Sequence, residues 1–280
     1  GIDVIITDHH ECQGQIPNAY AVIDPKRDDC KYPFKGLCGC GVAFKLISAL
    51  SGEKKLKETI NDYLEIVSLA TICDIMPVLD ENRIIVKNGL EILASGNNVG
   101  MKALIKVCGL EGKKIKSSHL GFAIGPRINA CGRLGFSNLG VELFTEKNPD
   151  KAEKLAELMD LKNQERQEIE ARIYKEAENL ISSNQVHQDG IIGIVASKLT
   201  EKYYKPCILL CIEGESATGS ARSIKGFDLF SALYECRDLM EKFGGQEEGA
   251  GLTISVDNID ELRNKINGIA DYQLEVEDLI

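Results

Sequence analysis

The sequence predicts an α/β protein made of two α/β lobes that a long helix joins. A short apolar run, Ile2 to Ile6, ends in the polar cluster Thr7-Asp8-His9-His10, as buried parallel strands do at the edge where α/β folds hold ligands. A helical pattern of apolar residues fills residues 149–181. Helix and strand patterns alternate again after it, which indicates a second, smaller lobe.

Each expected element follows from its apolar pattern and its turn residues. Pro149 and Asp150 suit the start of the long helix, because proline fits a first turn and an acid favours its positive end. An ordinary amphipathic surface helix is the alternative for that segment. The expected strands are 4–6, 21–23, 206–212 and 252–256, the expected helices are 41–50, 56–70, 88–93, 101–107, 149–181, 191–204 and 229–243, and residues 219–226 are expected to form a loop.

The composition is that of a globular protein, with 44% hydrophobic and 27% charged residues. No stretch reaches the roughly 18 apolar residues of a membrane span and no secretory pattern opens the chain, so we expect a cytoplasmic protein without membrane contact. The ten cysteines form no paired Cys-x-x-Cys sets, which favours reduced thiols over a zinc site. The chain starts with Gly1 inside an expected strand, and we expect it to be part of a longer protein.

The net charge of −10 conceals a basic segment between residues 101 and 140. This segment holds seven lysines and arginines against one acid, Glu111. A basic strip on an acidic protein can bind phosphate locally without a general affinity for DNA. A solvated lysine face is the alternative, and it suits the lysines of the segment better than Arg127 or Arg133.

The cluster Asp8-His9-His10 carries the donor atoms of a divalent metal site. Carboxylate oxygens and imidazole nitrogens suit manganese and similar ions, and half of the four histidines of the chain stand here. Taken by itself, the cluster has an alternative interpretation as a polar turn at the end of a strand.

Five motifs, in order along the chain, resemble those of the DHH phosphoesterase superfamily and, within it, of the RecJ-like exonucleases. They are Thr7-Asp-His-His10, Leu69-Ala-Thr-Ile-Cys-Asp74-Ile-Met-Pro77, Gly125-Pro-Arg-Ile-Asn-Ala-Cys-Gly-Arg133, Gly190-Ile-Ile-Gly-Ile-Val-Ala-Ser197 and Gly219-Ser-Ala-Arg-Ser223. The resemblance implies a DHH domain at 1–147 that lacks its first part, a connecting helix at 148–182, and a DHH-associated, substrate-binding domain at 183–280.

The resemblance implies hydrolysis of phosphodiesters with two divalent metal ions, Mn²⁺ or Mg²⁺. It assigns His9 and Asp74 as metal ligands, His10 as a contact of the scissile phosphate, and Asp8 as the acceptor that supports the histidines. Without the resemblance, Asp74 is a candidate helix or turn cap. The other ligands of the family are aspartates upstream of Asp8, and we expect this chain, which begins too late to contain them, to be incomplete as an enzyme.

The resemblance also implies contacts with nucleic acid. Arg127 and Arg133 lie in a Gly/Pro/Asn-rich segment where the backbone can approach a ligand closely, and the arginine fork suits phosphate. Ser220 and Arg222 are implied to form a phosphate clamp, in a glycine-flanked loop that receives the 5′ end of DNA. The alternatives are arginines that bond to loop carbonyls, and a simple surface turn.

Several features depart from the family pattern. Gly244, Gly245 and Gln246 stand where the family has Gly-Gly-His, and glutamine cannot carry the charge of a histidine. Residues 182–189 are too few for the strand and Trp-His pair that the family usually has there.

The small residues of the Gly190–Ser197 motif suit either anion binding or, preferably, tight packing. The family's OB-fold is expected beyond Ile280.

The sequence therefore predicts part of a metal-dependent exonuclease that degrades single-stranded DNA 5′→3′ in DNA repair and recombination. We expect a monomer, with helicases or single-strand-binding proteins as partners. One alternative is a DHH phosphodiesterase of oligonucleotides or cyclic dinucleotides, which the basic segment and the long helix disfavour. The other is an inactive nucleic-acid-binding relative, which the missing aspartates and Gln246 favour.

Overall fold

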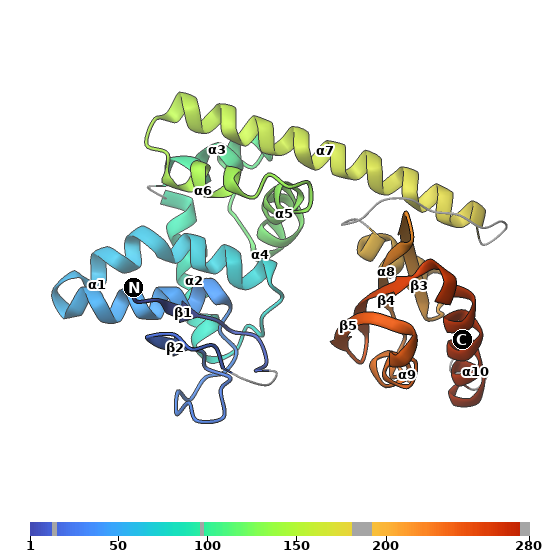
Figure 1. Ribbon diagram of the computed structural model, residues 1–280. Coiled ribbons are helices and arrows are strands. Elements are labelled where there is room, and N and C mark those ends of the chain that lie inside the picture. The colour runs from blue at the N-terminus through green and yellow to red at the C-terminus, as the bar shows by residue number, and fades with distance from the viewer. Residues whose placement is uncertain (13–15, 96–97, 181–191, 275–280) are drawn as a thin grey trace. The chain divides into compact units, whose positions relative to one another are not determined.

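The computed structural model describes residues 1–12, 16–95, 98–180 and 192–274, and it divides into two compact units, Gly1–Asn163 and Gln164–Ile280 (Figure 1). The division falls inside the long helix α7 (Pro149–Leu180). Residues 182–189 and Gly190 lie outside the described residues. No described helix is both long enough and apolar enough to cross a membrane. The α/β class expected from the sequence is confirmed.

The first unit contains a parallel pair of short strands. β1 (Ile5–Thr7) and β2 (Ala21–Ile23) run in the same direction, so their carboxyl ends share one edge. The apolar residues of and before β1 are not buried as expected, because Ile2 is 92% exposed and Val4 and Ile5 are about half exposed. The expected strand is present, but the expectation that it is buried was wrong, because β2 is the only described strand that pairs with β1.

Helix α1 (Gly39–Cys73) folds back on itself at Gly52. Gly52 adopts φ 65° and ψ 171°, a region that is essentially restricted to glycine. Cys38 caps the first turn, and its Sγ also lies 3.6 Å from Oγ1 of Thr71, near the other end of the helix. The two halves therefore lie side by side, and they correspond to the two helices expected at 41–50 and 56–70.

Shorter helices complete the first unit around a core that includes Leu104, Leu120 and Leu143, all fully buried. The helix expected to start near residue 88 begins earlier, because Asp80 and Glu81 suit the positive end of a helix. These elements are α2 (Asp80–Ser95), α3 (Val99–Val107), α4 (Ser117–His119), a π-helical turn (Leu120–Ile124), α5 (Gly125–Arg133) and α6 (Asn138–Thr145).

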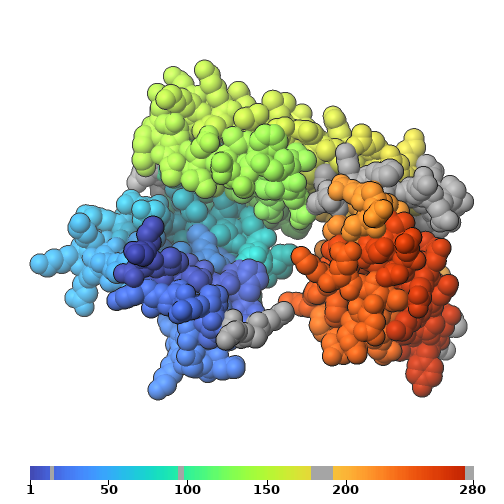
Figure 2. Space-filling model, viewed as in Figure 1, coloured from blue at the N-terminus to red at the C-terminus, as the bar shows by residue number. Residues whose placement is uncertain are grey.

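The second unit has an antiparallel sheet of four strands in the order β3-β4-β6-β5. One face packs its apolar side chains against helices α9 and α10. The other face is covered at β3 and β4 by α8, and Figure 2 shows these described elements as one packed body. The elements are α8 (Ile192–Tyr203), β3 (Cys207–Glu213), β4 (Ser216–Arg222), α9 (Leu229–Glu235), β5 (Met240–Gln246), β6 (Gly249–Ser255) and α10 (Ile259–Gln273).

Two expectations for the second unit were wrong. Residues 219–222, the first half of the loop expected at 219–226, belong to strand β4. Gly219 is explained by close packing between strands, since a Cβ there would lie 2.6 Å from Leu210 and 2.9 Å from Leu252. The helix expected at 229–243 ends at Glu235, and strand β5 follows after a 3₁₀ turn (Arg237–Leu239). Helix α10 was not expected from the sequence.

Glu65 is a buried acid in the first unit, with 1% of its surface exposed. Its Oε1 accepts a bond of 3.2 Å from the backbone N–H of Asn98, while its Oε2 has no hydrogen-bond partner within the described part of the chain. Burial is the main cause that raises the pKa of Glu65 to about 7. Ionisation of this carboxyl therefore costs the folded state stability as the pH rises from about 4.5 to above 7.

Replacing Glu65 by glutamine removes this cost, because the amide oxygen can still accept from Asn98 and no charge is buried. We expect Glu65→Gln to raise the free energy of unfolding by about 1–3 kcal/mol at pH 8.5 and to have little effect near pH 4.5. Denaturant unfolding at both pH values measures the difference. Glu58→Gln, at an exposed position of the same helix, is the control. A stabilisation that does not depend on pH would contradict the role of the Glu65 charge.

Candidate functional site

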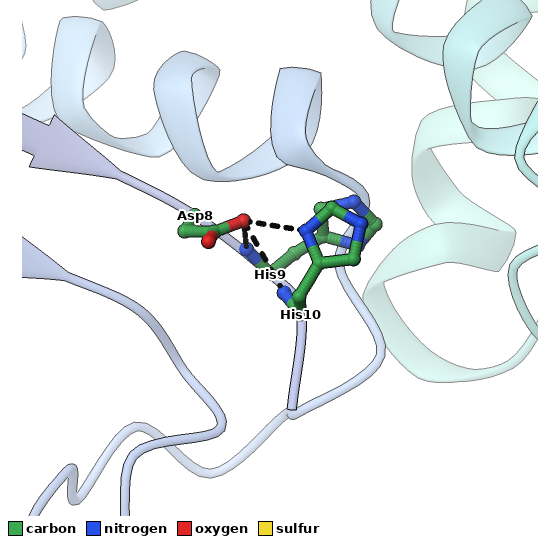
Figure 3. A group of neighbouring side chains, drawn as sticks. All are labelled: Asp8, His9 and His10. Atoms are coloured by element: carbon green, nitrogen blue, oxygen red, sulfur yellow. Dashed lines mark hydrogen bonds and ion pairs between the residues drawn. The ribbon is translucent and has the colours of Figure 1, made fainter. Parts of the chain in front are cut away.

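Asp8 organises the cluster that follows β1. Its Oδ1 accepts from the backbone N–H groups of His9 at 2.7 Å and His10 at 3.3 Å, and it lies 2.8 Å from Nδ1 of His10 (Figure 3). The bond with the His10 ring is the largest cause that lowers the pKa of Asp8 below its ordinary value of 3.8. An ionised Asp8 therefore fixes the turn and the orientation of the His10 ring.

His9 meets Asp74, which lies far along the sequence, at the end of α1. Nε2 of His9 lies 3.5 Å from Oδ2 of Asp74, and the histidine is the more buried partner. Gly39 in the first turn of α1 lies against the same ring, since a Cβ at Gly39 would be 3.3 Å from Cδ2 of His9. The ring of His9 is thus held between the two ends of the folded α1.

Helix α5 packs closely against the end of α1 that carries Asp74. A Cβ on Gly125 would lie 2.4 Å from Sγ of Cys73 and 2.9 Å from the carbonyl oxygen of Leu120. Arg127 and Arg133 were expected in an irregular segment, but both belong to α5, whose first turn contains Pro126. The close contact with Cys73 explains why the motif Gly125–Arg133 begins with a glycine, since a larger residue would overlap the thiol.

The cluster fits a divalent metal ion. Donor atoms of Asp8, His9 and His10 lie within 4.8 Å of one another, and the gap between His9 and Asp74 is close to that of two ligands of one ion. Oδ1 of Asp8 already accepts from the turn and from His10, which suits this carboxylate to orient the cluster, while His9 and Asp74 hold atoms that can face a metal. The mixed imidazole and carboxylate set suits Mn²⁺.

The two expected arginines of α5 differ in their surroundings. Arg127 is 18% exposed at its side chain and pairs with Asp160 of α7, with both Nε and Nη2 at 2.8 Å from Oδ1, and its Nη1 donates to the carbonyl of Ala123 at 2.7 Å. Arg133 is exposed at the end of the helix. A phosphate that reached Arg127 would have to share it with Asp160.

Ser220 and Arg222 lie on β4 of the second unit, on the face that α8 covers. Arg222 donates from Nε to Oγ of Ser197 at 3.1 Å, and from Nη1 to Oγ of Ser220 at 3.2 Å and to the carbonyl of Ala221 at 2.8 Å. All of these partners are neutral, and among the described residues no carboxylate pairs with Arg222. An arginine whose charge is not balanced by an acid is suited to bind an anion.

The sheet brings Gln246 to the same face as Arg222. Both residues pair with Gly249 of β6, one from each side, and directly opposed residues of antiparallel strands point to the same face. Gly244 shares this face with Gln246. Gly245 faces the core, where a Cβ would lie 2.3 Å from the carbonyl oxygen of Gly249.

Three residues of these sites were not expected from the sequence. Asp160 is 33 positions from Arg127, so no local pattern connects them. Gly39 gave no signal beyond its place in a glycine- and cysteine-rich segment. Ser197 ends the fourth motif, and its spacing of four residues from Gly193 on a helix is the signal that places both on one helix face.

The two ends of the chain match models of known families. Residues 1–71 match the DHH family, N-terminal domain, and residues 176–271 match the DHHA1 domain. The single-stranded-DNA-specific exonuclease RecJ of Bacillus subtilis (strain 168) is 41% identical over 293 residues, which cover 100% of this chain. The chain is a RecJ-like member of the DHH family. Escherichia coli (strain K12) RecJ is 35% identical over 288 residues and 92% of this chain.

Solved structures agree with the RecJ-like assignment. A crystal structure of RecJ with Mn²⁺ from Thermus thermophilus has a TM-score of 0.84 and 27% identity, and covers 98% of this chain and 42% of that one. A manganese-bound exonuclease RecJ has a TM-score of 0.77, also with 27% identity, and covers 100% of this chain and 73% of that one. The chain spans 37% of the Bacillus relative and 50% of the Escherichia relative.

The packing of α5 on α1 gives a prediction for this RecJ-like chain. We expect Gly125→Ala to destabilise the protein by about 1–3 kcal/mol, because the new methyl overlaps Cys73. Gly132→Ala, in the same helix, is expected to be neutral or stabilising by about 0.5–1 kcal/mol, because a Cβ there meets no described atom within 4 Å outside the backbone of its own helix and its chain neighbours. Thermal unfolding compares the two. Equal effects of both substitutions would show that Gly125 is not fixed by this contact.

Proposed function

We propose that the protein to which this chain belongs is a metal-dependent, single-strand-specific DNA exonuclease that works 5′→3′ in DNA repair and recombination. The approach of His9 to Asp74, with Asp8 bracing the turn, is the observation that carries this proposal. The identity with RecJ enzymes over the whole chain supports the same substrate and reaction. In this proposal the domain boundaries remain 1–147, 148–182 and 183–280.

The proposed catalytic work is divided among the residues of the first unit. His9 and Asp74 hold the metal, which would be Mn²⁺ or Mg²⁺, as in the RecJ structures. When bound, it would supply an activated water and neutralise the charge of the phosphoryl oxygens. Asp8 keeps His10 oriented by accepting from its Nδ1–H, and Nε2 of His10 is proposed to face the phosphate, to which it can donate when the imidazole carries both ring protons.

The second unit is proposed to bind the end of the strand. Arg222 and Ser220 contact the terminal phosphate, and Gly244, Gly245 and Gln246 form the neighbouring part of the same sheet. Arg127 and Arg133 are proposed to contact the DNA backbone from α5. Arg222 has the stronger support of the three arginines, since its described partners are all neutral.

Two finer assignments belong to the same proposal. We propose a cytoplasmic monomer that works with helicases or single-strand-binding proteins, as expected for an enzyme that needs exposed single strands. An inactive nucleic-acid-binding relative is the second candidate. The observation that favours it is Gln246, a neutral residue at the position where the family carries histidine.

Metal binding tests the first unit. We expect Mn²⁺ to bind the wild-type chain, and His9→Ala to weaken this binding at least about tenfold through loss of a ligand. Asp8→Asn is expected to weaken it by about 10- to 100-fold, because the turn loses its charged acceptor. Electron paramagnetic resonance of free Mn²⁺ gives the affinities. His119→Ala, outside the cluster, is the control, and equal affinity of the wild-type and His9→Ala chains would contradict the assignment.

Degradation of 5′-labelled single-stranded DNA tests the reaction. We expect Mn²⁺-dependent loss of label with the full-length protein to which this chain belongs and none with its His9→Ala variant, while duplex DNA of the same sequence stays intact. DNA binding that depends on Arg222 without any cleavage would favour the inactive relative. Cleavage that His9→Ala leaves unchanged would contradict the proposed metal site.

A further inference from the structure

Ser197 is a polar residue in the middle of α8, between apolar neighbours that face the interior. Val195, Ala196 and Leu199 around it are buried. Serine is a poorer helix former than alanine, because its hydroxyl competes for backbone hydrogen bonds. A hydroxyl at this position therefore needs a reason beyond helix formation.

The hydrogen bonds of Ser197 supply that reason. The hydroxyl lies 3.0 Å from the carbonyl oxygen of Gly193 and 3.1 Å from Nε of Arg222. A guanidinium can only donate, so the single proton of Ser197 must go to Gly193 and its oxygen must accept from Arg222. The direction of both bonds is fixed, and the plane of the guanidinium is fixed with them.

The remaining groups of Arg222 define what its open side can bind. Nη1 is engaged by Ser220 and the carbonyl of Ala221, whereas Nη2 has no hydrogen bond within the described part of the chain. Gly193 lets α8 lie close to this nitrogen, since a Cβ there would stand only 3.3 Å from Nη2 and 3.0 Å from Oγ of Ser220. Nη2 and the Ser220 hydroxyl thus both lie next to Gly193 in the first turn of α8, and no described carboxylate bonds to Arg222.

We propose that Ser197 is a positioning residue for a terminal phosphate monoester, which it serves by holding Arg222. The inference rests on the proposed function, because it assumes that Arg222 and Ser220 receive the 5′ end of a single strand. With Ser197 in place, Nε is occupied and Nη2 is presented to the phosphate in one orientation. Without Ser197, the guanidinium can rotate about its last side-chain bonds. Phosphate binding then has to offset the conformational entropy that is lost when the guanidinium becomes ordered.

Binding of two oligonucleotides tests the inference on the whole chain. Single-stranded DNA with a 3′ fluorophore carries either a 5′-phosphate or a 5′-hydroxyl, and anisotropy without divalent metal ions measures both affinities. We expect the wild-type chain to prefer the 5′-phosphate, and Ser197→Ala to lose about tenfold of that preference while its affinity for the 5′-hydroxyl strand is unchanged. Ser197→Thr keeps the hydroxyl and is expected to restore most of the preference.

Thr200→Val is the matched control, because it also removes a hydroxyl from α8. Oγ1 of Thr200 is buried and has no hydrogen-bond partner among the described residues, so its loss is expected to leave the phosphate preference unchanged. A Ser197→Ala chain that keeps the full preference, while Arg222→Ala loses it, overturns the role of Ser197 and leaves the proposed function standing. A wild-type chain that binds neither strand overturns the proposed function and this inference together.

Discussion

The reversal of α1 at Gly52 is the constraint on which the candidate metal site of His9 and Asp74 depends. An unbroken helix of its 35 residues would place its ends roughly 50 Å apart. Because the chain turns back at Gly52, Gly39 in the first turn and Asp74 after the last turn both reach His9. The geometry of the candidate site thus depends on a backbone conformation that only glycine adopts readily, at a residue that is distant in sequence from both His9 and Asp74.

The end of α1 is held by a second set of contacts. Asp74 and Met76 donate backbone bonds to the carbonyls of Ala70 and Thr71, and Gly125 lets α5 approach the preceding Cys73. Ile75, which lies between Asp74 and Met76, adopts φ 54°, a conformation that is unfavourable for a β-branched residue. Its side chain is 91% exposed. Strain of this kind persists where surrounding bonds fix the backbone, and here it sits beside a proposed ligand.

The sequence was sufficient for features that depend on local pattern or on ordered motifs. The parallel strands, the two halves of α1, the long helix α7 and the α/β class all follow from apolar periodicity and from turn residues. The strand β4 did not, because Gly219 and Ser220 are typical of loops, and Gly219 is explained only by Leu210 and Leu252 on neighbouring strands.

Partners that are distant in sequence account for the other differences at the candidate sites. The pairing of Arg127 with Asp160, and of Arg222 with Ser197, could not be read from the sequence because neither pair is linked by helix or strand periodicity. These partners change the interpretation of residues that the sequence treated alike. One arginine is neutralised by an acid, and the other is held by hydroxyls that leave its charge available.

Neutral partners matter for Arg222 because the protein as a whole is acidic. With a net charge of −10, general attraction between the chain and a nucleic acid is weak, so selectivity has to come from local geometry. On this face of the sheet, Arg222 of β4 pairs with Gly249 of β6, which pairs on its other side with Gln246 of β5, and neither residue adds charge. A single oriented cation distinguishes a terminal phosphate, which carries more charge than an internal diester, better than a broad basic surface would. Under the proposed role of Ser197, fixing Arg222 matters most in this setting, because one oriented guanidinium makes the contacts that several mobile lysines would make on a basic surface.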